Sequence, residues 1–177
     1  DAIKRASASE ITVIMPYFGY GRQDRQDDQR KSVGSKLIID MIEKACSPVP
    51  GRIMTFDLHT MQTQAYSNFP FEHLQSHTVF KHYMNYIDSK DVVLASPDVG
   101  GIKRARAFMN QCNIKSMVML DKVRTSPNIV DSFTLIGDIK DRDVLIIDDL
   151  IDTGGTLFGA ADFLIKKNAK KRVFMIP

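Results

Sequence analysis

An adjacent pair of carboxylates, followed by threonines and glycines, offers the clearest binding chemistry in this sequence. The residues concerned are Asp148, Asp149, Asp152, Thr153, Gly154, Gly155 and Thr156. Carboxylates accept hydrogen bonds from sugar hydroxyls, whereas backbone N–H groups and threonine hydroxyls donate to phosphate oxygens. We therefore expect the acidic pair to bind a sugar and the Asp152–Thr156 segment to bind its phosphate.

A buried strand must carry this acidic pair. Residues 144–147 are apolar and mostly β-branched, without the alternation of a half-exposed strand, which predicts a parallel strand covered on both faces. Apolar residues spaced by three and four from Leu157 onward predict a helix whose N-terminus faces the phosphate. An ordinary turn whose aspartates cap the helix is the alternative. The order of strand, acidic pair and Thr-Gly-Gly-Thr favours the binding site.

A second segment of similar layout lies earlier in the chain. The strand over residues 91–96 runs into Pro97, Asp98, Val99, Gly100 and Gly101. The glycine N–H groups can point at a diphosphate, and Asp98 would bind it through Mg²⁺ because a bare carboxylate repels phosphate. Lys103, Arg104 and Arg106 on the next helix add positive potential. The alternative is a simple turn before a solvated basic helix face.

Two segments near the N-terminus have side chains suited to a nucleotide. A strand over residues 11–16 precedes a polar loop over 17–30, where Arg22 can meet phosphates and Gln23 can hydrogen-bond. A solvated surface loop is the alternative. A second strand, residues 52–59, ends with Asp57 and His59, which alternation would place on one side to face a cation or phosphate. A hydrogen-bonded strand-end histidine is the alternative there.

Cations also end a later strand. Residues 116–124 read as a strand that ends with Lys122 and Arg124, which can reach one site together before a polar loop and a further strand over 132–137. Residues 76–89 are expected to be helical. His73, His77 and His82 have no ligand spacing and are interpreted as structural.

The bulk composition excludes several classes of protein. With 177 residues, 44% hydrophobic content and a net charge of +3, the chain is globular and lacks the basic clusters with interleaved aromatics expected for nucleic-acid binding. Cys46 and Cys112 fit no metal or redox spacing and are interpreted as thiols in a reducing cytosol. No apolar run reaches membrane-spanning length. We expect a cytoplasmic protein that binds neither nucleic acid nor membrane.

The segments taken together resemble the ribose-phosphate pyrophosphokinase (PRPP synthetase) family, class I type. The resemblance runs along nearly the whole chain and rests on Tyr20–Asp24, Asp57–His59, Ser96–Gly101, Lys122 and Arg124 ahead of Asn128, and Asp148–Thr156. It implies an α/β fold of two phosphoribosyltransferase-like domains, each a mainly parallel sheet flanked by helices. The domains would be residues 1–75, the rear of the N-terminal domain, and 76–177, most of the C-terminal domain. Because flanking family segments are absent at both ends, we expect an internal fragment.

The resemblance also implies an activity and a role for each matching residue. Family members transfer the diphosphoryl group of ATP to the 1-hydroxyl of ribose 5-phosphate, giving 5-phosphoribosyl 1-diphosphate (PRPP) and AMP, for nucleotide biosynthesis. By this resemblance Arg22, Gln23, Asp24 and His59 bind ATP; His59, Asp98 and Asp57 belong to the Mg²⁺ site; Asp98, Gly100 and Gly101 form the diphosphate loop; Lys122 and Arg124 are catalytic; and Asp148, Asp149 and Asp152–Thr156 bind ribose 5-phosphate.

The resemblance also implies self-association, because family members form dimers and hexamers.

Two other functions are alternatives to this activity. Some relatives of the family are non-catalytic regulatory homologues. A phosphoribosyltransferase of nucleotide salvage would account for Asp148–Thr156 but leaves Arg22, His59 and Lys122 without a role. The presence of Lys122 and Arg124 favours the enzyme over the regulatory homologue.

Overall fold

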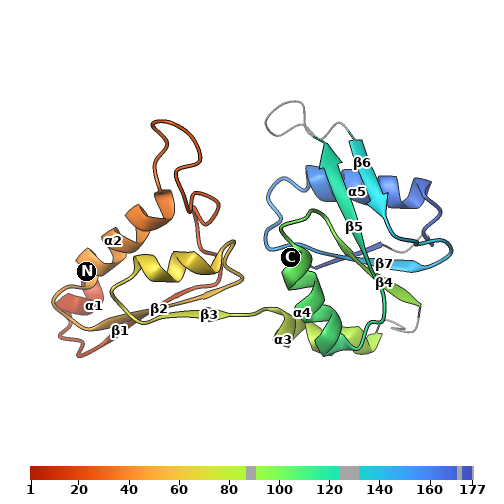
Figure 1. Cartoon of the computed structure of the whole chain (residues 1–177). Helices are drawn as coiled ribbons and strands as arrows, with labels where there is room; N and C mark the ends of the chain where they lie inside the picture. The colour runs from red at the N-terminus through yellow and green to blue at the C-terminus, as the bar shows by residue number, and fades with distance from the viewer. Residues whose placement is uncertain (87–90, 124–131, 171–172, 177) are drawn as a thin grey trace. The chain divides into compact units, whose positions relative to one another are not determined.

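Two separate sheets form the framework of the protein, which we describe from a computed structural model (Figure 1). The structure describes residues 1–86, 91–123, 132–170 and 173–176. The chain divides into two compact units, Asp1–Ser76 and His77–Pro177.

The first unit is built on a three-stranded parallel sheet. Its elements in chain order are α1 (Ala2–Arg5), β1 (Ile11–Met15), α2 (Gly34–Cys46), β2 (Gly51–Phe56), the 3₁₀ helix η1 (Met61–Tyr66) and β3 (Phe71–Leu74). The strands lie in the order β1-β2-β3. Buried residues alternate along β2, so one face carries Ile53 into a core that Ile39 of α2 also enters. Helix α2 therefore covers that face of the sheet.

The strand β2 ends earlier than the sequence predicted. It stops at Phe56, and Asp57 has a positive φ of 37°, a conformation that aspartate tolerates better than most residues. The expectation that strand alternation puts Asp57 and His59 on one side is therefore wrong. His73 lies in β3, a strand that the sequence pattern did not predict in this helix-rich stretch.

The second unit contains a five-stranded sheet. Its elements are α3 (His77–Phe80), the 3₁₀ helix η2 (Lys81–Tyr86), β4 (Val92–Ser96), α4 (Ile102–Cys112), β5 (Met117–Val123), β6 (Ser132–Ile136), β7 (Asp143–Ile147), α5 (Gly155–Lys166) and β8 (Val173–Ile176). The order is β6-β5-β4-β7-β8, with β6 antiparallel at one edge and the other strands parallel. Helices α3 and η2 fall within the predicted helical stretch 76–89, of which residues 87–90 lie outside the described residues.

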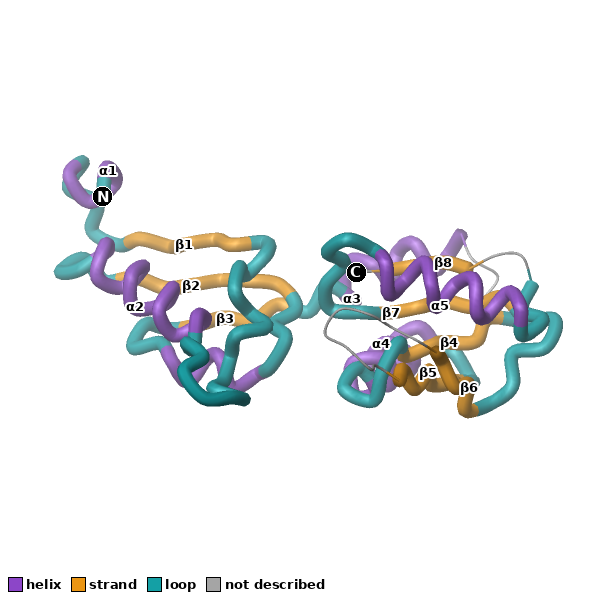
Figure 2. The backbone as a smooth tube through the Cα atoms, turned by 90° about the horizontal axis from the view of Figure 1, so that it is seen from above, coloured by secondary structure: helices purple, strands orange, loops and turns teal. Residues whose placement is uncertain are grey.

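Both faces of this sheet are covered, because β4 and β7 are buried at every position. On one face Val93 and Ile146 pack with Leu164 of α5, and on the other Leu94 and Leu145 pack with Phe108 of α4. Figure 2 shows α5 running along the sheet near β7. An apolar run without alternation is what a strand between two helical layers requires.

The fold class predicted from the sequence is confirmed: an α/β protein with mainly parallel sheets flanked by helices. The assignment of residues 1–75 and 76–177 to two phosphoribosyltransferase-like domains stays a prediction. In the part of the chain that the structure describes, no helix combines the length and apolarity needed to span a bilayer.

Candidate functional site

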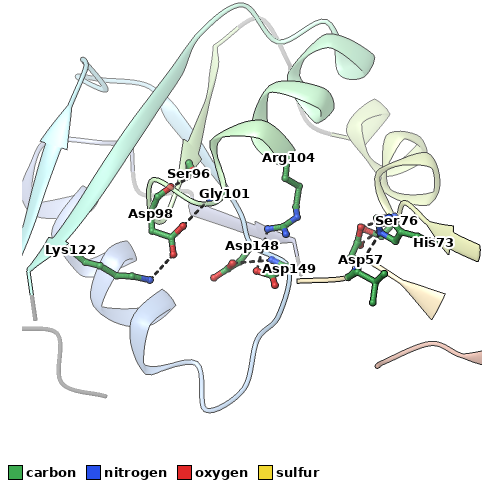
Figure 3. Close-up of polar contacts among 11 residues, drawn as sticks. Asp57, His73, Ser76, Ser96, Asp98, Gly101, Arg104, Lys122, Asp148 and Asp149 are labelled. Carbon is green, nitrogen blue, oxygen red and sulfur yellow. Dashed lines mark hydrogen bonds and ion pairs between the residues drawn. The ribbon is translucent and has the colours of Figure 1, made fainter. Parts of the chain in front are cut away.

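The acidic pair lies directly after the buried strand β7 (Figure 3). The backbone N–H of Asp149 donates to Oδ1 of Asp148 at 2.9 Å. Burial, together with the nearby carboxylates of Asp149 and Asp98, raises the pKa of Asp148 to about 6. Because this pKa lies below 7, Asp148 is mainly ionised near neutral pH and accepts hydrogen bonds. A cation or a hydroxyl donor placed here would reduce the repulsion among these acids.

Arg104 of α4 holds the second acid of the pair. Its Nη1 donates to Oδ1 of Asp149 at 3.2 Å, and the two side chains are only 24% and 10% exposed. A planar guanidinium suits a carboxylate acceptor and fixes its orientation. The pair therefore connects the helix after β4 to the strand end of β7.

The Thr-Gly-Gly-Thr segment forms the turn into α5. Gly154 has a φ of +78°, and a side chain there would meet the ring of Phe158 at 2.8 Å. Gly155 opens the helix and has no such crowding. Asp152, Thr153 and Gly155 are exposed, so the helix N-terminus and its donors are accessible to an anion.

The loop after β4 is a tight turn closed by its own side chains. Ser96, fully buried, donates its hydroxyl to the carbonyl oxygen of Asp98 at 2.7 Å, and the N–H of Gly101 donates to Oδ1 of Asp98 at 2.9 Å. A Cβ on Gly101 would lie 2.8 Å from the Ser96 hydroxyl. The glycine is therefore required for the close approach of this loop to the end of β4.

Lys122 near the end of β5 reaches the same loop. Its Nζ lies 2.9 Å from Oδ2 of Asp98. Burial raises the pKa of Asp98, but the Lys122 ammonium and the Gly101 N–H outweigh it, so that the pKa lies below its ordinary value. Asp98 is thus held as a carboxylate with a cation beside it.

These groups meet because of the strand order. The chain passes from β4 to its neighbour β5 on one side and from β7 to its neighbour β8 on the other, so the direction of winding reverses between β4 and β7. Ligands of open α/β sheets bind beyond the carboxyl ends of the strands at such a point. Asp98 and Asp148 follow the two strands that flank it. The arrangement can bind hydroxyls and phosphates side by side.

In the first unit, the loop after β1 presents Arg22 and Gln23 on the exposed surface. Its backbone is tied down at Gln23, whose N–H donates to the carbonyl oxygen of Tyr20 at 2.8 Å. Asp24 points elsewhere: its Oδ2 accepts a hydrogen bond from Oγ1 of Thr60 at 2.8 Å. Arg22 and Gln23 are thus exposed side chains, whereas Asp24 is half-buried and hydrogen-bonded to Thr60.

Asp57 and His59 have different surroundings. Both carboxylate oxygens of Asp57 accept from the N–H of Ser76 at 3.3 Å, so Asp57 fastens the end of its own unit (Figure 3). His59 is exposed. His73 accepts the N–H of Leu58 on Nε2 at 3.1 Å, which agrees with a structural role.

A metal site is not assembled by the described residues alone, since no three His, Cys, Asp or Glu side chains among them group as ligands. Asp57 and His59 lie in the first unit and Asp98 in the second. Their assignment to Mg²⁺ stays a prediction, as do the ATP and ribose 5-phosphate assignments. Arg124 and Asn128 lie outside the described residues.

Two contacts were missed by sequence reasoning. Arg104 was interpreted only as a source of positive potential, and the bond between Asp24 and Thr60 was not foreseen. For Arg104 a signal existed: it lies three residues after Gly101, within one turn of the start of α4. Nothing in the sequence pairs Asp24 with a residue 36 positions away.

Family models match most of the chain. Residues 62–175 match the phosphoribosyl transferase domain, and residues 1–46 match the N-terminal domain of ribose phosphate pyrophosphokinase. The match over residues 62–175 alone places the protein in the phosphoribosyl transferase class. With both matches in order, the chain belongs to the ribose-phosphate pyrophosphokinase family.

Curated relatives and a solved structure agree. Proteins named ribose-phosphate pyrophosphokinase from Porphyromonas gingivalis and Prochlorococcus marinus subsp. pastoris are 44% and 42% identical, matching 99% and 98% of this chain but 55% and 51% of their own length. The crystal structure of phosphoribosylpyrophosphate synthetase from Mycobacterium smegmatis superposes with a TM-score of 0.86 at 31% identity, covering 98% of this chain and 55% of that one. The chain spans about half the length of these relatives.

Proposed function

We propose that this chain forms the core of a ribose-phosphate diphosphokinase, which transfers the diphosphoryl group of ATP to the 1-hydroxyl of ribose 5-phosphate, giving PRPP and AMP. The observation that carries the proposal is the meeting of strand ends in the second unit. Acids, cations and glycine-containing turns lie together where the sheet reverses its winding, with Lys122 2.9 Å from Asp98 and Arg104 3.2 Å from Asp149. The names of the relatives indicate the same reaction class.

Each group has a task in this reaction. Asp148 and Asp149 accept hydrogen bonds from the ribose hydroxyls, and the N–H groups and hydroxyls of residues 153–156 bind the 5-phosphate. The turn at Gly100 and Gly101 holds the transferred diphosphate. Lys122, with Arg124, supplies positive charge as negative charge develops on the phosphoryl oxygens. In the first unit Arg22, Gln23 and His59 bind ATP.

Mg²⁺ fits this set of residues. Asp98 accepts one donor on each oxygen, and each oxygen retains a lone pair. Protein Mg²⁺ is commonly bound by one or two carboxylates together with substrate phosphates and water, so a three-ligand cage is not needed. Bound Mg²⁺ would neutralise charge on the nucleotide phosphates. Asp57, like Asp98, already accepts a hydrogen bond, in its case from the N–H of Ser76.

The test is the reaction itself, carried out by the protein in its full natural length. With ATP, Mg²⁺ and ribose 5-phosphate we expect AMP and PRPP in equal amounts, and no AMP when ribose 5-phosphate is left out. Formation of a nucleotide from PRPP and a free base would instead identify a salvage transferase. Absence of AMP, combined with binding to an active homologue, would support a regulatory role. Self-association and a cytoplasmic location are further parts of the proposal, open to sedimentation and cell fractionation.

A further inference from the structure

The turn over residues 20–24 is fastened from two sides within the first unit. On one side Ser35, which is fully buried at the start of α2, donates its N–H to the carbonyl oxygen of Gln23 at 3.1 Å and its hydroxyl to that of Tyr20 at 2.7 Å. On the other side the hydroxyl of Tyr66 donates to the carbonyl oxygen of Asp24. The backbone of the turn is thus anchored to both α2 and η1.

The side chain of Asp24 extends the second anchor. Thr60 Oγ1 donates to Asp24 Oδ2 at 2.8 Å, and the hydroxyl of the fully buried Thr63 lies 3.4 Å from that of Thr60. A carboxylate only accepts, so Thr60 gives its proton to Asp24 and its oxygen is left to accept from Thr63. The three side chains form one chain of hydrogen bonds from the interior to the turn.

This chain of hydrogen bonds joins two segments that matter for the nucleotide. Asp24 directly follows Arg22 and Gln23, and Thr60 directly follows His59. We propose that Asp24 is a positioning residue, which fixes the spacing between Arg22–Gln23 and His59 through the hydroxyl of Thr60, and is not itself a ligand of ATP. The inference rests on the proposed function, which assigns these segments to ATP.

Charge supports a positioning role over direct contact. A carboxylate beside nucleotide phosphates would repel them unless a cation lay between. Asp24 is half-buried and one of its carboxylate oxygens accepts a hydrogen bond from Thr60, which is a structural contact and not one suited to binding an anion. Arg22 and Gln23, in contrast, are exposed and have the donors that phosphates and a base require.

The deciding variant is Thr60→Val in the full-length protein, because it removes the hydroxyl, keeps the shape and leaves Asp24 in place. We expect KM for ATP to rise about tenfold, with kcat and KM for ribose 5-phosphate within about twofold of wild type. Thr60→Ser retains the hydroxyl and should restore the wild-type KM. Thr12→Val, the same change at an exposed position of β1, serves as the matched control and should alter nothing.

A direct ligand and a positioning residue give different results. If Asp24 contacted ATP itself, Asp24→Ala would raise KM for ATP while Thr60→Val would not, and this outcome would overturn the inference. A fall in kcat with both KM values unchanged would overturn it as well, because that indicates only loss of folded protein. Should Thr60→Val fail to fold, Thr60→Ala removes the same hydroxyl, and an unchanged KM for ATP in that variant would also count against the inference.

Hydrogen exchange separates this inference from the proposed function. If wild-type protein makes no AMP, the proposed function fails, yet the anchor can still be measured by the exchange of amides in residues 20–24. We expect about tenfold faster exchange there in Thr60→Val than in Thr60→Ser or Thr12→Val. Equal exchange in all three would refute the anchor whatever the enzyme does.

Discussion

Lys122 is the described residue on which the proposed chemistry depends most. Its ammonium lies 2.9 Å from Asp98, so a phosphoryl oxygen would have to compete with this carboxylate for it. Lys122→Ala should lower kcat by about a hundredfold while changing either KM less than threefold, if its contact with substrate forms mainly in the transition state. Steady-state kinetics with both substrates checks this. Lys115→Ala, an exposed lysine just before β5, is the control. Unchanged turnover in Lys122→Ala would reduce Lys122 to a structural partner of Asp98.

We expect Arg104 to act through Asp149, the carboxylate to which it is hydrogen-bonded. Without its guanidinium, Asp149 would lose its ion pair with Arg104, although the carboxylate would remain. Arg104→Gln should therefore raise KM for ribose 5-phosphate about tenfold, and Asp149→Ala should raise it at least as much. Arg106→Gln, an exposed arginine on the same helix, should leave KM as it is. Calorimetric titration with ribose 5-phosphate gives the same comparison without turnover, and equal affinities for Arg104→Gln and Arg106→Gln would contradict the role.

Asp148 makes the stability of the second unit depend on pH. Its pKa rises from 3.8 to about 6 on folding, so the folded state binds the extra proton between these values. This contribution to stability is fully present below pH 3.8 and is lost as the pH rises through about 6, up to about 3 kcal/mol in total. Asp148→Asn should flatten that part of the profile. Urea unfolding between pH 4 and 7, followed for wild type and variant, measures the difference, and parallel profiles would contradict the raised pKa.

At the level of elements, the central strands and the loops after them followed from the sequence, while the shorter elements did not. The apolar runs of β4 and β7 are typical of strands between helical layers, and the acids after them needed no tertiary information. β3 has four residues and depends on pairing with β2, which a local pattern cannot reveal. The end of β2 is set at Asp57, whose carboxylate binds the N–H of Ser76, 19 residues away.

The turn into α5 needs glycine at position 154 but not at position 155. Gly154 has a positive φ and would place a Cβ 2.8 Å from Phe158, whereas the nearest atom to a Cβ on Gly155 is the Thr153 hydroxyl at 3.7 Å. Gly154→Ala should lower the free energy of unfolding by about 1–2 kcal/mol and weaken ribose 5-phosphate binding, because the phosphate-binding amides would shift. Gly155→Ala should change stability by less than about 0.5 kcal/mol. Urea denaturation of both variants makes the comparison, and equal losses would mean that the strain is not at Gly154.

At the level of the whole molecule, each unit has its own hydrophobic core among the described residues. Phe18, Ile39, Ile53 and Leu58 cluster in the first unit, and two larger clusters cover the two faces of the sheet in the second. Cooperative unfolding follows shared apolar burial, so separate cores predict separate responses to core damage. The two units should then behave as distinct units of unfolding.

Ile53→Ala tests this separation, because Ile53 is fully buried in the first core and its truncation should cost about 2–5 kcal/mol there. Amide exchange followed by mass spectrometry should speed up in peptides of residues 1–76 and stay near wild type in residues 91–123 and 132–170. Ile146→Ala, at an equally buried site in β7, should give the reverse pattern. If either substitution accelerated amide exchange equally in both units, the chain would unfold as one cooperative unit. Ile53→Ala would then raise the exchange rate at the end of β7 as much as in β2.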